Sequence, residues 1–263
     1  MGYLVKKKLL ALFVIILFSA NVAIVASEET KLSPIIIVTT SGYAPYVSLN
    51  TEGQYEGFDI DLSRFLGEKL KREVVFKDFG SMPGLLLALK QKRVDMVIWA
   101  ISITKDRMEK MDFVYYQGAI IETTPFLFWK QIPPGLETIN DLEKIPNSVV
   151  CVEAGSAQED LLKSFPNLKL KYADKVLDII MDLRYGKCLT TTVDPGVVPG
   201  YVKKHPELKV VELPLPEHQK MFGNGIAIDK SNSELTEKVR VAIAQLTSEG
   251  KIAELEKKWN MEG

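Results

Sequence analysis

The sequence predicts an α/β fold, because short strands and helices alternate along it. Runs of apolar, often β-branched residues, typical of strands covered on both faces, recur and are followed by helical periodicity. The pattern begins again near residue 148, and residues 117–125 separate two apolar segments, so we expect the chain to cross there into a second lobe. Strands are expected at residues 35–40, 74–76, 94–98, 148–152, 188–193 and 223–228.

Apolar side chains at helical spacing predict the helices between these strands. Asp59 and Asp61 fall in the first turn of one helix, where negative charge is favourable, so we interpret both as helix-start residues rather than catalytic carboxylates. The glycine-led strand at 223–228 is expected to return the chain to the first lobe. The helices expected are residues 58–70, 83–92, 104–111, 157–165, 175–185, 233–247 and 251–259.

The first 27 residues have the pattern of a secretory signal peptide. Three lysines at residues 6–8 precede an apolar run at 9–18, and Val25-Ala26-Ser27 offers small residues for cleavage. The alternative is an uncleaved membrane anchor, because about 18 mostly apolar residues approach spanning length. No cysteine stands at the cleavage point, so a lipid anchor is not expected.

Composition excludes several classes of partner. Removal of three lysines takes the formal charge from −1 to about −4 in a mature chain of about 236 residues, and no basic stripe indicates nucleic-acid binding. Cys151 and Cys188 are expected to form a disulfide in an exported protein, the alternative being two buried thiols. These cysteines, with His205 and His218 in proline-containing segments, make no metal site, so neither metal nor cofactor is expected.

Residues 94–107 run from a buried strand through a polar corner into a helix start. Thr104 is a good N-cap, and Arg107 lies in the first turn. A helix N-terminus favours anions, and an arginine adds two parallel donors for a carboxylate. The alternative is an ordinary surface arginine.

A weak internal repeat in the sequence places an acid at the end of a second strand. Residues 85–100 and 179–194 share the order helix, basic turn, strand and polar corner, which puts Asp194 at the carboxyl end of its strand. Tyr43 lies in an aromatic loop after the first strand. Arg107 suits a carboxylate and Asp194 an ammonium, so the pair would match both ends of a free amino acid. The alternative for Asp194 is a turn residue before Pro195.

Four motifs, in order, resemble a known family. Together they cover essentially the whole mature chain, and the segment Leu183-Arg184-Tyr185-Gly186-Lys187 is most similar to arginine-binding members. The resemblance is to the periplasmic polar amino-acid-binding proteins of ABC importers, solute-binding protein family 3. The motifs are Gly57-Phe58-Asp59-Ile60-Asp61-Leu62, Ser102-Ile103-Thr104 with Arg107, Gly155-Ser156-Ala157-Gln158-Glu159, and Leu246-Thr247-Ser248-Glu249-Gly250 with Lys257-Lys258-Trp259.

The resemblance implies the two-lobe, type II periplasmic-binding-protein fold, each lobe a mixed sheet flanked by helices. Lobe 1 would comprise residues 28–120 and 225–263, and lobe 2 residues 121–224. It further implies a monomeric periplasmic protein without catalysis, which captures an L-amino acid, most readily arginine, and delivers it to a membrane permease.

By match of position, the resemblance implies that Arg107 binds the α-carboxylate, Asp194 binds the α-ammonium and Tyr43 stacks on the ligand side chain. The remaining contacts would come from Ala100, Ser102, Ala157 and Gln158.

Several positions depart from the family pattern. Thr40 stands where many members with cationic ligands carry an acid, and Trp99-Ala100 replaces two small residues. Met82 stands at the position of the usual aromatic near the second helix, although Phe79 is close to it in sequence. Glu153 would supply the missing anion, with Trp99 stacking on the ligand; the alternative is an exposed strand-end glutamate. Glu153 as a general acid of a dehydratase-like enzyme, or the whole chain as a tethered sensor, are the other functions considered.

Overall fold

The computed structural model describes residues 32–261. The expected signal peptide at residues 1–27 lies outside this part of the chain. Among the helices of residues 32–261, none has the length and apolar character needed to cross a membrane.

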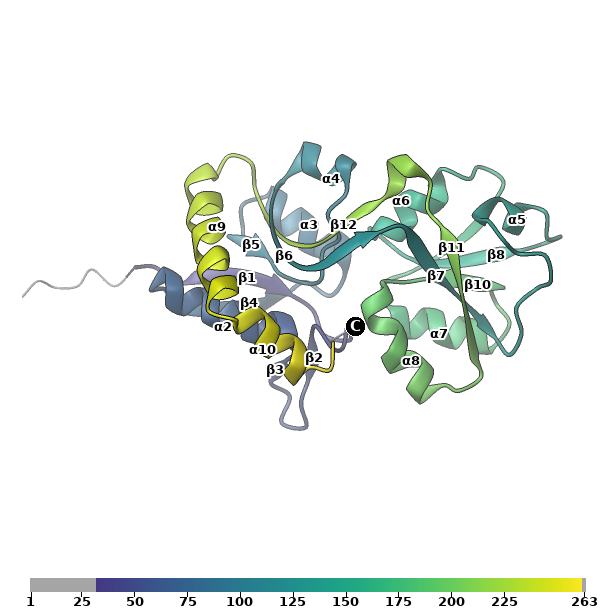
Figure 1. Ribbon diagram of the computed structural model, residues 1–263, viewed down its shortest axis with the longest axis horizontal. Coiled ribbons are helices and arrows are strands. Elements are labelled where there is room, and N and C mark those ends of the chain that lie inside the picture. The colour runs from purple at the N-terminus through teal and green to yellow at the C-terminus, as the bar shows by residue number, and fades with distance from the viewer. Residues whose placement is uncertain (1–31, 262–263) are drawn as a thin grey trace, which may run out of the picture. The chain divides into compact units, whose positions relative to one another are not determined.

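The first of two five-stranded sheets has the order β4-β1-β5-β12-β6. Strand β1 pairs in parallel with β4 and β5, and β12 pairs antiparallel with β5 and β6. Helices flank this sheet (Figure 1). Its strands are β1 (Ile35–Thr39), β4 (Val74–Asp78), β5 (Met96–Val97), β6 (Asp112–Ile121) and β12 (Met221–Ile228), and the helices are α2 (Phe58–Leu70), α3 (Met82–Lys90), α4 (Lys105–Lys110), α9 (Ser233–Ser248) and α10 (Lys251–Lys258).

The second sheet has the order β11-β7-β10-β8-β9. Strand β8 pairs in parallel with β9 and β10, whereas β7 pairs antiparallel with β10 and β11. Its strands are β7 (Thr123–Trp129), β8 (Val149–Glu153), β9 (Lys169–Ala173), β10 (Thr190–Thr192) and β11 (Leu208–Pro214), and its helices are α5 (Ile139–Glu143), α6 (Ala157–Lys163), α7 (Val176–Arg184) and α8 (Val198–Lys204).

Two segments carry the chain between the sheets. Strand β6 of the first sheet is followed by β7 of the second, with Glu122 between them, and β11 leads back through a short 3₁₀ turn into β12. We call β6 and β12 the crossing strands. The boundaries of the two lobes stay a prediction.

Burial of apolar strands explains the layers. Ile35, Ile37 and Val38 of β1 are buried beneath helix side chains that include Phe58 and Leu62 of α2. This is the pattern expected of a parallel strand covered on both faces. The α/β class, with two mixed sheets flanked by helices, is therefore as predicted.

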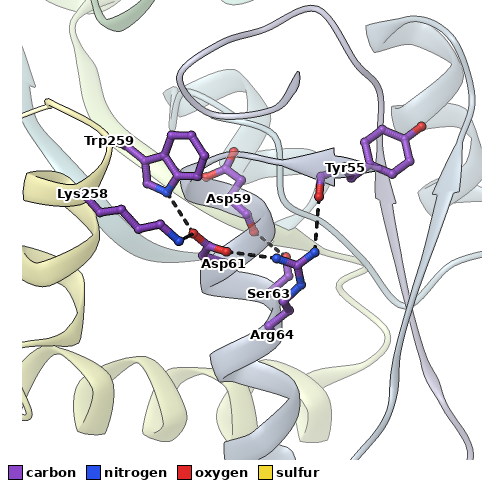
Figure 2. Close-up of polar contacts among 7 residues, drawn as sticks. All are labelled: Tyr55, Asp59, Asp61, Ser63, Arg64, Lys258 and Trp259. Carbon is purple, nitrogen blue, oxygen red and sulfur yellow. Dashed lines mark hydrogen bonds and ion pairs between the residues drawn. The ribbon is translucent and has the colours of Figure 1, made fainter. Parts of the chain in front are cut away.

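The last helix is fastened to α2 by one carboxylate (Figure 2). Asp61 accepts a hydrogen bond from the Trp259 indole at 2.9 Å and contacts the Lys258 ammonium at 2.7 Å and the Arg64 guanidinium at 3.0 Å. Asp61 therefore does more than complement the dipole of α2, because it joins the end of α10 to the first turn of α2.

Sequence patterns missed mainly edge and short elements. Strands β9 and β11 lie at the two edges of the second sheet and carry exposed lysines, a common protection of sheet edges that breaks the apolar run. Helix α8 has no fully buried residue, so it carries no apolar periodicity. Strands β6 and β7 were expected only as apolar segments on either side of residues 117–125, without a strand assignment. The other missed elements are α5 and the hairpin of β2 (Ser48–Leu49) with β3 (Tyr55–Glu56).

Cys151 and Cys188 form a disulfide, as predicted, which joins β8 to the segment before β10 across 37 positions of sequence. Replacing both cysteines by alanine should lower the free energy of unfolding by roughly 4 kcal/mol in the chain-entropy treatment. Denaturant titration of the oxidised protein and the double variant measures this difference, and reductant should weaken only the former. Two titratable thiols in the denatured, unreduced protein would contradict the bond.

Candidate functional site

Arg107 is a buried cation whose donors face backbone carbonyls. The Thr104 hydroxyl accepts from the Arg107 backbone N–H at 3.3 Å and so caps α4 as predicted. The guanidinium, in a residue only 4% exposed, donates to the Ser102 carbonyl at 3.0 Å and the Gly155 carbonyl at 2.9 Å. Burial lowers its pKa, whereas the neighbouring acidic groups of Asp160, Tyr43 and Glu153 oppose that shift. The alternative of a surface arginine is therefore wrong.

Asp194 lies two residues after the buried strand β10 and is 4% exposed. One carboxylate oxygen accepts from the Gly196 backbone N–H at 2.8 Å, so the turn role considered from sequence is also present. Burial raises the pKa of Asp194 to about 6, and the Gly196 hydrogen bond lowers it. Gly196 itself leaves no room for a side chain, because a Cβ there would lie 2.4 Å from the Tyr46 hydroxyl.

Glu153 ends β8 and is 5% exposed, so the alternative of an exposed strand-end glutamate is wrong. Burial raises its pKa to about 8; the Arg107 charge lowers it, and the charges of Asp194 and Asp174 raise it further. No hydrogen bond reaches its carboxylate from any residue between 32 and 261. Glu153 is thus a buried acid whose ionised form lacks a donor.

Tyr43 and Trp99 form an aromatic pair beside these charges. Their ring centroids are 4.6 Å apart with an interplanar angle of 36°, and both residues are buried. The Trp99 indole donates to the Thr40 carbonyl at 2.9 Å, which orients the ring. Burial raises the pKa of Tyr43, and the charges of Asp194 and Glu153 raise it further, so both acids act on this ring.

The other predicted residues lie at the two polar corners of the site. Ala100 has a left-handed backbone (φ 46°), and Ser102 forms an isolated β-bridge with Asn224 of β12. Ala157 and Gln158 are buried in the first turn of α6. The structure therefore brings Arg107 into the electrostatic neighbourhood of Glu153 and Tyr43, and places the remaining predicted residues at adjoining strand and helix ends.

Asp59 was underestimated by sequence reasoning, since it is a fully buried carboxylate beside the site. It accepts from the Ala100 N–H at 2.7 Å and from the Tyr116 hydroxyl at 2.8 Å. Burial raises its pKa to about 7, the two hydrogen bonds lower it, and the charge of Asp194 raises it. The sequence offered one sign of this burial, because Asp59 lies between two apolar residues, Phe58 and Ile60, and the structure buries both.

The buried charges of the site decide which kinds of molecule it would favour. Buried carboxylates and a buried guanidinium are costly unless they are paired, so a molecule that supplies the opposite charges recovers part of that cost. Asp59 already accepts two hydrogen bonds within the protein. The remaining set, Arg107 with Asp194 and Glu153, suits a molecule with one carboxylate and two positive groups. Within residues 32–261, no group of three or more histidine, cysteine, aspartate or glutamate side chains is arranged to hold a metal ion.

Comparison with known proteins defines the class. Residues 35–262 match the bacterial extracellular solute-binding proteins, family 3, and the chain belongs to this family. A relative described as the probable ABC transporter arginine-binding protein ArtJ of Chlamydia trachomatis is 30% identical over 226 residues, which cover 86% of this chain and 85% of the relative. The family resemblance drawn from the motifs is confirmed.

Solved structures agree on the fold. The chain is similar to an ancestral arginine-binding protein bound to arginine, with a TM-score of 0.75, 27% identity and coverage of 87% of this chain and 99% of the other. It is also similar to the ancestral amino acid-binding protein AncCDT-1, described as a precursor of cyclohexadienyl dehydratase, with a TM-score of 0.73, 26% identity and coverage of 86% and 95%. The predicted fold class is confirmed.

The raised pKa values of Glu153, Asp59 and Asp194, about 8, 7 and 6, make stability depend on pH. As pH rises above about 4, these acids lose protons in the unfolded chain before they do so in the folded one. The free energy of unfolding of the ligand-free protein should therefore fall between about pH 5 and pH 8, by up to about 1.4 kcal/mol per pH unit for each group.

Replacing Glu153 by Gln should remove the contribution of this carboxyl to the pH dependence of stability. E153Q should therefore be more stable than the wild type at pH 8, and its stability should depend less on pH. Urea titrations at pH 5 and pH 8 measure this, with exposed Glu109→Gln as the matched control. Equal pH dependence in E153Q and the wild type would contradict the assigned burial.

Proposed function

We propose that this protein captures free L-arginine and delivers it to the membrane permease of an ABC importer. The observation that carries the proposal is the buried set of one guanidinium, Arg107, and two carboxylates, Asp194 and Glu153, in a solute-binding protein. A relative and a structural neighbour are both described as arginine-binding.

The main-chain groups of the ligand would be bound by opposite charges. Arg107 would bind the α-carboxylate through guanidinium donors other than those it uses on the Ser102 and Gly155 carbonyls. Asp194 would accept from the α-ammonium. Ser102, Ala157, Gln158 and the Ala100 backbone would complete these contacts.

The ligand side chain would be recognised by Glu153 and the aromatic pair. Thr40 carries no charge, so Glu153 is the buried acid available for a guanidinium, and Tyr43 and Trp99 offer ring faces for a planar cation. Arginine contributes one negative and two positive groups. Against Arg107, Asp194 and Glu153 the total charge is then zero, which is the least costly outcome for buried ions.

The proposal includes cellular placement. Cleavage of residues 1–27 would release the chain into the periplasm as a monomer, with lobe 1 at residues 28–120 and 225–263 and lobe 2 at 121–224. The family description as extracellular solute-binding proteins supports export.

The second candidate is a dehydratase-like enzyme in which Glu153 acts as general acid. A pKa near 8 favours it, because such a group is protonated at neutral pH, and so does the likeness to a dehydratase precursor. We favour binding without catalysis, because that precursor and the relative above are themselves described as binding proteins.

A thermal-shift screen of the twenty amino acids tests the function. L-arginine at a hundred times its dissociation constant should add about 2.7 kcal/mol of stability. Recovery of unchanged arginine by NMR after incubation separates binding from catalysis. Absence of any shift with L-arginine at millimolar concentration would refute the proposed ligand.

Arg107→Ala and Asp194→Ala should each abolish the arginine-dependent shift, because each leaves one charged end of the ligand buried without its partner. Titration calorimetry measures the loss. The exposed residues Arg184 and Asp106, changed to alanine, are matched controls that should bind normally. Near-wild-type affinity for arginine in R107A or D194A would refute the assignment of that residue to the ligand site.

Glu153→Gln should weaken L-arginine far more than L-glutamine, by tenfold or more in relative affinity, because a charge-assisted hydrogen bond to the guanidinium becomes a neutral one. Glutamine shares the α-amino-acid groups and lacks the side-chain cation. Competition calorimetry with both ligands gives the ratio, and an equal loss for the two would remove Glu153 from specificity.

A further inference from the structure

We propose that Asp59 is a positioning residue for the ligand site. It holds residues 99–102, here called the Ala100 corner, in their binding geometry, and it connects that corner to the crossing strand β6 through Tyr116. The inference rests on the proposed function, since it assigns Ala100 and its neighbours to ligand contact.

The carboxylate of Asp59 bridges two distant segments. One oxygen accepts from the Ala100 backbone N–H at 2.7 Å, and the other accepts from the Tyr116 hydroxyl at 2.8 Å. Asp59 is fully buried, whereas an acid needed only to complement a helix dipole is served by an exposed position. Figure 2 shows Asp61 on the same turn, and there Asp61, not Asp59, contacts Trp259 and Lys258.

The backbone conformation of the Ala100 corner must be stabilised by residues outside it. Its φ of 46° lies in the left-handed region, which alanine adopts at a cost and retains only when surrounding groups determine it. Trp99 on one side packs on Tyr43, and the Ser102 carbonyl on the other accepts from Arg107. The orientation of this corner therefore sets several proposed ligand contacts at once.

Tyr116 connects the corner to a crossing strand. It lies in β6, and its ring stacks on Phe58 with centroids 6.0 Å apart. The Asp59 backbone N–H also donates to the Tyr46 carbonyl, and the Tyr46 hydroxyl accepts from Asn224 of β12 at 3.1 Å. Both crossing strands thus reach Asp59, so their conformation and the geometry of the site are linked through it.

The two hydrogen bonds distinguish positioning from burial alone. Both donors favour the ionised carboxylate and oppose the effect of burial on its pKa. In Asp59→Asn, the amide oxygen can accept from the Ala100 N–H, and the amide nitrogen can donate to the Tyr116 oxygen. In Asp59→Ala, both buried groups lose their partner.

The experiment compares D59A, D59N, Y116F and the matched control D61N. Three quantities are measured: exchange of the Ala100 amide in ligand-free protein relative to the Leu62 amide within α2, the dissociation constant of L-arginine, and the melting temperature. D59A should speed Ala100 exchange and weaken arginine binding by about tenfold or more, as expected for an unpaired buried amide.

D59N should return both quantities to within about threefold of the wild type, Y116F should fall between D59N and D59A, and D61N should lower only the melting temperature. If D59A does not fold, the other two variants test the inference. Y116F should then speed exchange of the Ala100 amide, and D59N should not. Wild-type exchange and affinity in D59A, or D59N as impaired as D59A, would overturn the inference. A wild type that fails to bind arginine refutes the proposed function, while the exchange measurement still tests Asp59.

Discussion

The buried guanidinium of Arg107 constrains both sheets. A buried cation is tolerated only where acceptors satisfy it, and Arg107 uses the Ser102 carbonyl after β5 and the Gly155 carbonyl after β8. Gly155 has a φ of 74°, and a Cβ there would lie 3.1 Å from the Pro83 ring, so glycine permits this approach. The hydrogen bonds of one side chain therefore join the ends of strands from both sheets.

The buried acids Asp194 and Glu153 show how stability and function oppose each other. Asp194 has one backbone donor, Glu153 has none from residues 32–261, and burial raises the pKa of both. A protein selected for stability alone would replace these buried charges with apolar residues. Under the proposed function, the same desolvation makes the acids selective, because a ligand that lacks a cationic group leaves a carboxylate without its partner.

Sequence reasoning succeeded where structure is local. Apolar runs and helical spacing gave the central strands other than β7 and the long helices, and strand ends gave the positions of Arg107 and Asp194. It failed where the deciding contact is distant. Asp59 fitted a helix-start role because Ala100 and Tyr116, its partners, lie 41 and 57 positions away. Glu153 was undecided because burial of a strand end depends on packing that no local pattern encodes.

The departures from the family pattern are connected. Where the resemblance leads to an acid after the first strand, the chain has Thr40, whose carbonyl accepts from the Trp99 indole. Trp99 thus occupies the space beside Tyr43 on the side of the first sheet, while the uncompensated acid, Glu153, ends a strand of the second sheet. A ligand cation would then be held by an aromatic face from one sheet and a charge from the other. Under the proposed function the side chain of arginine, as well as its α-groups, contacts residues from both sheets, so ligand discrimination and closure around the ligand depend on the same contacts.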